Sequence, residues 1–364
     1  MERIYLVGAG VIARAHAEGA RRHVADLELH VTDPNSATIA AFCSENPQVV
    51  VHPSVDEMLR AAPRPNDIVI IATPPGTHMN LAMQALESGR HVLCEKPLGM
   101  TFAEARDMVS EAKGRQLLLG DCSMRFFGYG ANEALKAALA TGVLGEIYHI
   151  KSRHLIARGR SGIEYQPETR WFLEKSKAGG GVLFDWGVYD LSTLFEVLAP
   201  EAVRIAQAWT ARPVTQIDPP GSIDLEHVVG AAMSVRLPGE RWVPLSYERG
   251  SATHGTEVLL MEIEGTLGAA TWQWLPWTND ETSLTITTDL NGHPERHTER
   301  FPSASEIHFH HRPLYYFRAA VAGTQGSALV NDGALFNFSV LTSIYDVAAD
   351  ALPREVTRAM VDPQ

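Results

Sequence analysis

The chain has 364 residues, which is too long for one ordinary domain and suits two. Its net charge is −12, and no cluster of lysines and arginines forms a basic stripe, which argues against a nucleic-acid partner. The three cysteines include no CxxC pair, so a reducing compartment is favoured over a disulfide framework. The apolar runs are too short for a membrane span, and the first strand leaves no room for a signal peptide. We therefore expect a cytoplasmic protein with no membrane contact.

Strands and helices alternate regularly over the first 120 residues. Apolar strands are expected near the N-terminus and at 27–33, 48–52, 67–75, 91–97 and 115–121. Helices are expected between them, at 11–22, 35–45, from 54, at 77–88 and at 101–113. Short connections between alternating elements indicate βαβ units. The pattern predicts a doubly wound parallel sheet, a Rossmann domain over residues 1–124.

The pattern changes after residue 125. A helix at 131–140 is followed by mostly strand-like segments, at 145–156, 203–212, 225–237, 242–248, 257–264, 268–275 and 283–289. Further helices are expected at 184–198 and 333–350. This predicts an α+β domain over 125–364 with a mostly antiparallel open sheet. The last helix could pack back on either domain.

A glycine motif follows the first strand and opens the first helix. Its residues are Gly8, Gly10, Val11, Ile12 and Ala13, in the pattern G-x-G-x-x-[G/A]. Gly8 allows the tight turn, Gly10 lets a pyrophosphate approach the backbone, and Ala13 lets helix and strand pack closely. The free N–H groups at the helix start suit phosphates. A glycine turn without a ligand is the alternative.

Asp33 ends the second strand, 23 positions after Gly10. A carboxylate there can hydrogen-bond a ribose 2′-hydroxyl and repels a 2′-phosphate, so NAD is favoured as the cofactor and NADP remains possible. An ordinary Asp-Pro-Asn turn is the alternative. Thr73 and Pro74 follow the fourth strand, at the edge where parallel sheets bind ligands. His78 is a further candidate for contact with cofactor or substrate, or a capping histidine.

Glu95-Lys96-Pro97 lies at the carboxyl end of the fifth strand, on the same edge of the sheet. A lysine there can reach a nicotinamide or a substrate hydroxyl and polarise a carbonyl oxygen. Glu95 can orient the lysine, and the Lys96–Pro97 peptide bond can be cis. A solvated Glu-Lys turn is the alternative.

Three glycines, 179–181, precede a helix that carries Asp185 and Tyr189. Their i, i+4 spacing places both on one helical face. A positive charge beside the tyrosine would favour tyrosinate, so Tyr189 is a candidate general acid/base. The alternative is a capping aspartate and a core tyrosine.

Together these motifs resemble those of the Gfo/Idh/MocA oxidoreductases. The resemblance rests on GAGVIA with Asp33, on CEKPLGMTFAEA, and on RWFLEKSKAGGGVLFDWGVYDL at 170–191. It implies a catalytic Lys96, a substrate-binding Asp185 and an acid/base at Tyr189. Many members have His at the last position and Asp three residues later, where this chain has Ser192. Arg125 resembles a family arginine near the nicotinamide, or it forms a salt bridge between domains.

The weaker candidates are aromatic and histidine residues. Trp171 is a candidate for stacking on a sugar ring, with core packing as the alternative. The stretch with Trp272, Trp274 and Trp277 is either core or a subunit interface, and the resemblance favours an interface. His308, His310 and His311 lack the ligand spacing of a metal site, so no metal is expected; they could edge the substrate pocket.

The resemblance implies an NAD(P)-dependent enzyme acting on a CH–OH group of a sugar, cyclitol or related polyol. The site would contain Lys96, Arg125, Trp171, Asp185 and Tyr189 for the substrate, with Glu95 also near the cofactor. A homo-oligomer, dimer or tetramer, through the second sheet is expected. Two alternatives remain, a non-catalytic regulator that senses a dinucleotide or sugar, and a sugar–sugar oxidoreductase with tightly bound cofactor.

Overall fold

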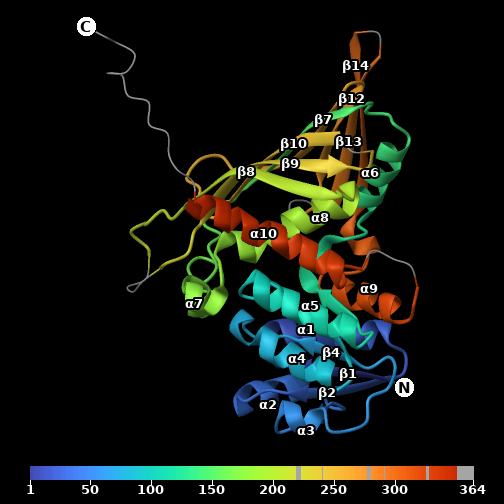
Figure 1. Ribbon diagram of the computed structural model, residues 1–364, viewed down its shortest axis with the longest axis vertical. Helices are drawn as coiled ribbons and strands as arrows, with labels where there is room; N and C mark the ends of the chain where they lie inside the picture. The colour runs from blue at the N-terminus through green and yellow to red at the C-terminus, as the bar shows by residue number, and fades with distance from the viewer. Residues whose placement is uncertain (219–222, 240, 277–279, 291, 325–327, 351–364) are drawn as a thin grey trace.

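The computed structural model describes residues 1–218, 223–239, 241–276, 280–290, 292–324 and 328–350. The chain forms two sheets with helices around and between them (Figure 1). The first sheet has six strands in the order β3-β2-β1-β4-β5-β6 and the second has eight in the order β14-β13-β12-β11-β7-β10-β9-β8. The mixed α/β fold with one parallel and one mostly antiparallel sheet is the one that the sequence predicts.

All strands of the first sheet are parallel. They are β1 (Glu2–Val7), β2 (Leu27–Thr32), β3 (Val50–Val51), β4 (Ile68–Ile71), β5 (His91–Cys94) and β6 (Leu119–Asp121). The connecting helices are α1 (Val11–His23), α2 (Ser36–Glu45), α3 (Val55–Met58), α4 (His78–Glu87) and α5 (Phe102–Gly114). The strand order reverses beside β1 and β4, so the ligand crevice of such a sheet lies at their carboxyl ends.

Helix starts in this half follow local sequence signals. Ser54 accepts a hydrogen bond from the backbone N–H of Glu57, and Thr101 accepts one from Glu104. Both contacts are the first half of a capping box, in which Ser or Thr is followed three residues later by Glu. The side chain of Asn35 caps α2 in the same way.

The second sheet is antiparallel except where β7 and β10 pair in parallel. Its strands are β7 (Ile147–Leu155), β8 (Ala202–Ala211), β9 (Val228–Leu237), β10 (Arg241–Gly250), β11 (Val258–Gly265), β12 (Gly268–Gln273), β13 (Glu281–Leu290) and β14 (His293–Pro302). Its helices are α6 (Gly130–Ala140), α7 (Lys175–Ala178), α8 (Val188–Leu198), α9 (Arg312–Val321) and α10 (Asp332–Asp350). Because β7, β8 and β10 run in the same direction, the loops that follow them gather at one edge.

The last helix lies between the two sheets. α10, red in Figure 1, packs on α5 of the first half and on β8 and α8 of the second. Just before it, Val330 forms an antiparallel bridge to Gly120 at the edge of β6. Lys113 and Asp332 add an exposed ion pair. The helix therefore contacts both halves. The domain division at residue 124 stays a prediction.

The structure corrects the interpretation of the tryptophan stretch. Trp272 and Trp274 are 2 % and 1 % exposed, inside the core of this single chain. Their indole N–H groups donate to Asn132 and His154. They are therefore core residues and not available to a subunit interface. Trp272 lies on the buried face of β12, and Trp274 follows the end of that strand. Trp277 lies outside the described residues.

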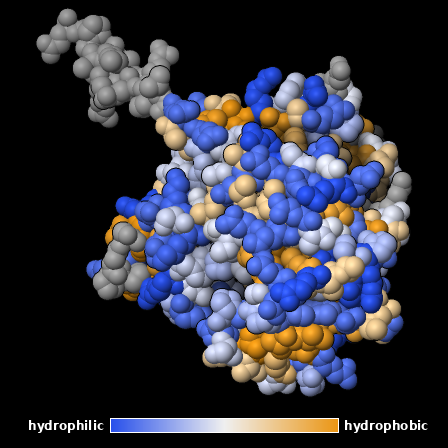
Figure 2. All heavy atoms as spheres, turned by 60° about the horizontal axis from the view of Figure 1, so that its bottom comes forward, coloured by the Kyte–Doolittle hydropathy of each residue, from blue (hydrophilic) through white to orange (hydrophobic). Residues whose placement is uncertain are grey.

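The tryptophans that do reach the surface lie on the opposite face of the second sheet. Trp209 is 47 % exposed and Trp242 is 36 % exposed, and the register of β8, β9 and β10 points both away from the helices. The face of the molecule shown in Figure 2 is mostly hydrophilic, with hydrophobic side chains in separate groups. Among the described residues, we find no helix with the length and hydropathy needed to cross a membrane.

Candidate active site

The glycine turn after β1 leaves the start of α1 open. Gly8 has φ +99°, and a Cβ there would lie 2.5 Å from the carbonyl oxygen of Ala72. Gly10 is the N-cap of α1 and provides no side-chain cap, and a Cβ there would meet no atom within 4 Å. Val11 is exposed and Ala13 is fully buried under the helix. The first N–H groups of α1 are thus accessible to a phosphate, which fits a dinucleotide.

Asp33 follows β2 and closes this turn from the other side. Its Oδ2 accepts from the backbone N–H of Ala9 at 2.9 Å, and its Oδ1 accepts from that of Asn35 at 2.8 Å. The carboxylate therefore stands beside the glycine turn, at the end of the strand next to β1. This is the position from which such an acid meets a ribose hydroxyl.

His78 joins two loops of the ligand edge. Its ring is fully buried, with Nε2 2.8 Å from the carbonyl oxygen of Thr73 and Nδ1 2.9 Å from that of Pro97. Burial lowers the pKa of His78. Thr73 also bonds the Thr77 hydroxyl, at 2.7 Å, and Pro74 precedes the short helical turn. His78 thus supports the loops from behind; a cofactor contact by Thr73 or Pro74 stays a prediction.

Lys96 extends from the end of β5 to the start of the second half. Its Nζ lies 2.6 Å from Oδ1 of Asp185 and 2.8 Å from the Asp185 carbonyl oxygen. It also lies 5.3 Å from the centroid of the Tyr189 ring. The peptide bond to Pro97 is cis. The structure therefore brings together Lys96, Asp185 and Tyr189, which are 93 residues apart along the chain at most.

Asp185 lies in a π-helical turn, η4 (Leu183–Gly187), that leads directly into α8. It does not cap a helix. Instead its Oδ2 accepts from the Ser161 hydroxyl at 2.5 Å, while its Oδ1 faces Lys96. Both oxygens are thus held, and the carboxylate orients the ammonium. Ser161 had no signal in the sequence, because it lies in an irregular loop after β7.

Tyr189 is buried and its hydroxyl accepts a hydrogen bond from Nη1 of Arg125 at 2.6 Å. Burial raises the pKa of Tyr189 well above its usual range, although the charge of Arg125 opposes the shift. A neighbouring positive charge thus favours tyrosinate, as expected, but burial has the larger effect on this hydroxyl. Lys96 faces the ring and Arg125 meets the hydroxyl. Because desolvation outweighs the charge of Arg125, Tyr189 is a phenol that can give a proton.

Arg125 links the two halves of the site. Its Nη2 donates to Glu95 in the loop after β5, and its Nη1 donates to Tyr189 on α8. The ion pair with Glu95 joins the loops after two neighbouring strands of the first sheet, β5 and β6, so the salt bridge between domains that was considered for Arg125 stays a prediction. Glu95 also accepts from the Lys96 backbone N–H at 3.2 Å through Oε2.

A small pocket opens beside Asp185. Its lining includes Ser161, Phe172, Trp186 and His227. Trp171 does not line it, but stacks on Phe172 with ring centroids 3.8 Å apart. Trp186 contacts the Tyr189 ring edge-on at 5.5 Å. Of the two tryptophans near the triple glycine, Trp186 is thus the one at the pocket wall.

Two residues from distant segments hold the triple-glycine turn. Glu226 accepts from the backbone N–H groups of Gly181 and Leu183, at 3.0 and 3.1 Å. The hydroxyl of Tyr345, on α10, donates to Glu226 at 2.6 Å. Burial raises the pKa of Glu226. The Glu226 carboxylate thus caps the helical segment that carries Asp185. It could not be predicted from the sequence, because it lies more than 40 residues away along the chain.

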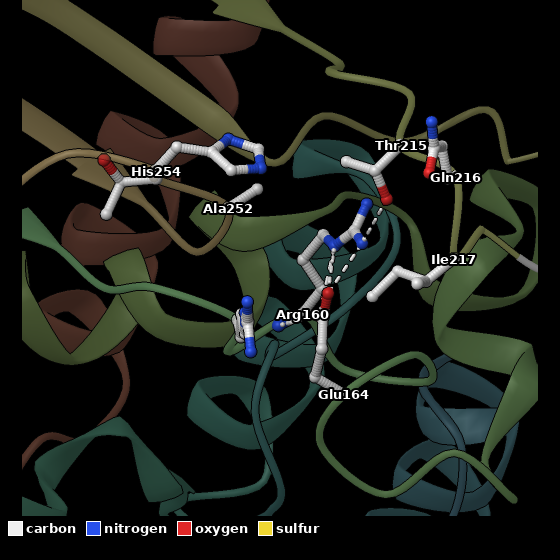
Figure 3. Close-up of a pocket in the computed structure, with 9 residues that line it drawn as sticks. Arg160, Glu164, Thr215, Gln216, Ile217, Ala252 and His254 are labelled. Atoms are coloured by element: carbon white, nitrogen blue, oxygen red, sulfur yellow. Dashed lines mark hydrogen bonds and ion pairs between the residues drawn. The ribbon is translucent and has the colours of Figure 1, made fainter.

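A larger cavity of about 540 Å³ adjoins the pocket (Figure 3). It lies between the loops after β7, β8 and β10. Its lining residues Arg160 and Ala252 are next in the chain to Ser161 and Ser251, which line the small pocket. Buried Arg160 ties its walls together through ion pairs to Glu164 and Asp218. Arg158 is exposed on the same wall. The polar stretch around these two arginines is typical of a solvated loop, but Arg160 is buried.

The three histidines before α9 lie side by side. Burial and then the charge of Arg125 lower the pKa of His310 to about 3. His311 faces Glu18 at 3.8 Å. Among the described residues they do not form a cluster with metal-ligand geometry. His310 therefore lies near Arg125 as a neutral ring.

Two family models match the chain. One is described as an oxidoreductase family with an NAD-binding Rossmann fold and matches residues 2–120; the other, the C-terminal domain of the same family, matches 132–285. The chain belongs to the Gfo/Idh/MocA oxidoreductase family. The resemblance seen in the motifs is confirmed, and so is the NAD-binding fold of the first half.

Curated relatives in this family are similar over part of their length. A 1,5-anhydro-D-fructose reductase from Ensifer adhaerens is 33 % identical over 212 residues, which are 57 % of this chain and 61 % of the relative. A D-glucoside 3-dehydrogenase from Escherichia coli is 34 % identical over 210 residues, 57 % of this chain and 56 % of the relative. The matches thus span less than two thirds of these relatives.

A solved structure shares the fold over nearly the full chain. A levoglucosan dehydrogenase in complex with NADH and L-sorbose aligns with TM-score 0.74 and 19 % identity, covering 96 % of this chain and 97 % of the other. At this identity the likeness shows the fold alone. The shared fold therefore extends over both halves of the chain.

Proposed function

We propose that the protein is an NAD-dependent dehydrogenase or reductase that acts on a secondary alcohol or ketone of a sugar or related polyol. The observation that supports it most is that Lys96 contacts both Asp185 and the Tyr189 ring at the ligand edge of an NAD-binding fold. The names of the relatives, a sugar reductase and a glucoside dehydrogenase, support a sugar as substrate.

The chain's own residues supply positioning, charge and a proton. NAD(H), when bound, supplies or accepts the hydride. The Lys96 ammonium has three N–H donors and donates two hydrogen bonds to Asp185. The third N–H can therefore donate to the oxygen of a substrate carbonyl. There its charge stabilises negative charge that develops on that oxygen.

Tyr189 is the proton donor for that oxygen in reduction. Because its oxygen accepts from Arg125, its own O–H bond is free to point elsewhere. In the oxidative direction the same atom takes the proton of the substrate hydroxyl. Asp185, held by Ser161 and Lys96, is placed to accept from a neighbouring hydroxyl. A polyol, with adjacent hydroxyls, matches this arrangement of one donor and one acceptor.

Asp33 supports NAD as the preferred cofactor. Its carboxylate lies beside the glycine turn, where it can accept from ribose hydroxyls and repel a 2′-phosphate. A 2′-phosphate would be attracted by a positively charged side chain in this turn. The next polar residue, Asn35, is neutral.

The adjoining cavity supports a substrate that extends beyond the reacting ring. Its volume, about 540 Å³, lies in the range of small-molecule sites. Arg160 is neutralised by Glu164 and Asp218, whereas Arg158 has no such ion pair among the described residues. The wall thus offers an uncompensated positive charge. We propose that the substrate carries a second group there, and that an acidic group is favoured.

We also propose a homo-oligomer through the outer face of the second sheet. The half-exposed Trp209 and Trp242 lie on that face. Aromatic residues of this kind are enriched in interfaces. The partner would be a second copy of the chain.

The enzyme is favoured over a non-catalytic sensor because a sensor need not keep the lysine, aspartate and tyrosine in contact. A screen of sugars, cyclitols and glycosides for NAD reduction, and of the matching ketones for NADH oxidation, tests the proposal. Turnover of a polyol that Lys96→Met abolishes supports it. Tight NAD binding without turnover of any of these compounds supports the sensor. A nicotinamide absorbance that survives dialysis and exchanges between two sugars supports the sugar–sugar oxidoreductase.

A further inference from the structure

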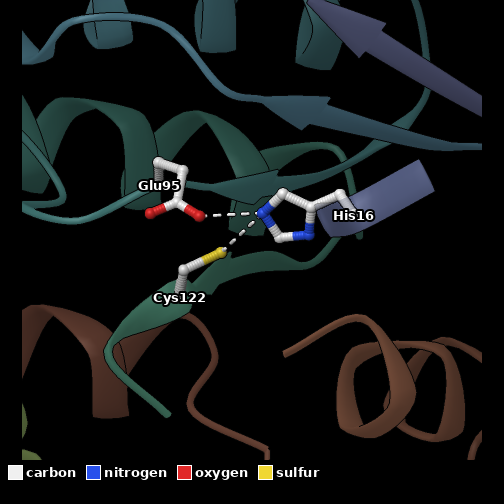
Figure 4. Close-up of side chains that lie close together, drawn as sticks. All are labelled: His16, Glu95 and Cys122. Carbon is white, nitrogen blue, oxygen red and sulfur yellow. Dashed lines mark hydrogen bonds and ion pairs between the residues drawn. The ribbon is translucent and has the colours of Figure 1, made fainter. Parts of the chain in front are cut away.

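A buried polar cluster lies beneath the loop that carries Lys96. Its members are His16 on α1, Glu95 after β5 and Cys122 after β6 (Figure 4). They are 0 %, 5 % and 0 % exposed. Nε2 of His16 lies 2.8 Å from Oε1 of Glu95 and 3.9 Å from Sγ of Cys122. Buried polar groups of this kind are costly unless they are paired, so the cluster needs an explanation.

A metal ion is a poor explanation for these three side chains. Arg125 donates through Nη2 to the same Oε1 that faces His16, so a guanidinium already occupies the space beside the carboxylate. Burial raises the pKa of the Cys122 thiol well above its usual range, which disfavours the thiolate that metals bind. A cation here would have to displace Arg125 from Tyr189.

The same contacts form a continuous path to the proton donor. His16 meets Glu95, Glu95 holds Nη2 of Arg125, and Nη1 of Arg125 donates to the Tyr189 hydroxyl. We propose that Glu95 and His16 are positioning residues that fix Arg125 against Tyr189 and thereby connect the cofactor-binding helix α1 to proton transfer. This rests on the proposed function, and gives these residues a role in it that is separate from cofactor contact.

The rigidity of the guanidinium makes the path effective. Its donors are held in one plane, so anchoring Nη2 at Glu95 also fixes the direction of Nη1. Burial opposes ionisation of Glu95, but Arg125 and His16 outweigh it and hold the pKa of this carboxyl well below its usual range. The anchor is therefore charged at every working pH.

The start of the path lies on the element that meets the cofactor. His16 is the sixth residue of α1, whose first turn follows Gly10. A shift of this helix on cofactor binding would move His16 and, through it, Glu95. Several other charged or titratable groups surround Arg125 and Glu95 among the described residues, namely Lys96, His78, Cys94, Asp121, Cys122, Tyr189 and His310.

A double-mutant cycle tests the proposal on the full-length protein. In the wild-type background, Glu95→Gln should lower kcat by roughly 10- to 100-fold, because the proton donor loses its fixed orientation. In the Tyr189→Phe background the same change should lower the residual kcat by less than about twofold, since the group it positions is gone. NAD binding, measured by tryptophan fluorescence, should stay unchanged.

Two further variants make the result specific. His16→Leu should show the same pattern with a smaller loss, and it covers the case in which Glu95→Gln does not fold. Asp67→Asn, a change at a buried carboxylate that is paired with Arg3 before β4, at the opposite edge of the sheet from Arg125, is the matched control and should keep kcat. Equal losses in both backgrounds, or an unchanged kcat, would overturn the proposal. If the wild type turns over no polyol, the proposed function fails instead.

Discussion

Arg125 donates a hydrogen bond to the hydroxyl of Tyr189 at 2.6 Å, yet burial still raises the pKa of that hydroxyl well above its usual range. The residue that the sequence marks as acid/base is thus a phenol in the free protein. A phenol gives a proton more readily than it takes one, so the direction of the reaction and the pH are linked.

We expect reduction of the ketone to vary little with pH from about pH 6 to about pH 8, since Tyr189 keeps its proton throughout. Oxidation of the alcohol should become faster as the pH rises, because it requires a group that accepts a proton. Initial rates in both directions, with saturating cofactor, measure this. An oxidation rate that is highest near neutrality and falls at higher pH would contradict it.

Asp33→Ala should move cofactor preference from NAD towards NADP by at least about tenfold, which is ~1.4 kcal/mol. In the proposed site this change removes the carboxylate that would repel a 2′-phosphate and leaves the glycine turn at Gly8 and Gly10 intact. Ratios of kcat/KM for the two cofactors give the result. If the wild type already prefers NADP, Asp33 does not set the preference.

Arg158→Ala should lower kcat/KM for an acidic glycoside by about tenfold. The kcat/KM for a neutral sugar with the same ring should stay unchanged. The positive charge in the 540 Å³ cavity is lost while the reacting end is untouched. Arg153→Ala is the control, because Arg153 is also exposed but pairs with Glu248 on the sheet. Equal changes in kcat/KM for acidic and neutral substrates would show that Arg158 does not select substrates by their charge.

The Trp209→Ser and Trp242→Ser pair should shift an oligomer towards monomer. Both indoles are part-exposed on the outer face of the second sheet, where their loss removes apolar contact area. Light scattering over a concentration series measures the mass, and Phe102→Ser, on the first half, is the control. A wild-type protein that stays monomeric at all concentrations would contradict the proposed homo-oligomer.

Local signals predicted the first half of the chain and the order of the second. The helix caps at Ser54 and Thr101 and the glycine turn are fixed by neighbours within four residues, so they are visible in the sequence. The sequence did not predict β14 or α9. β14 is almost wholly exposed and polar, so it has no alternating pattern, and α9 follows a histidine-rich loop that was considered only as a metal or substrate site.

The sequence predicted three residues that the structure brings together, but it did not predict the residues that hold them in place. Lys96, Asp185 and Tyr189 lie in motifs, but Ser161, Glu226 and Tyr345 reach them from elsewhere in the chain. Such contacts depend on the fold and leave no local spacing. The burial of Trp272 and Trp274 was also invisible, because an alternating aromatic face looks the same whether it meets a helix or another subunit.

The most direct test of the account is single-turnover hydride transfer in Lys96→Met, with NAD affinity measured on the same sample. Lys113→Met, which removes only an exposed ion pair to Asp332, is the control. The account predicts a rate lower by about 10²- to 10⁴-fold with NAD affinity nearly unchanged, because Lys96 acts on the substrate oxygen. Hydride transfer at the wild-type rate would contradict it.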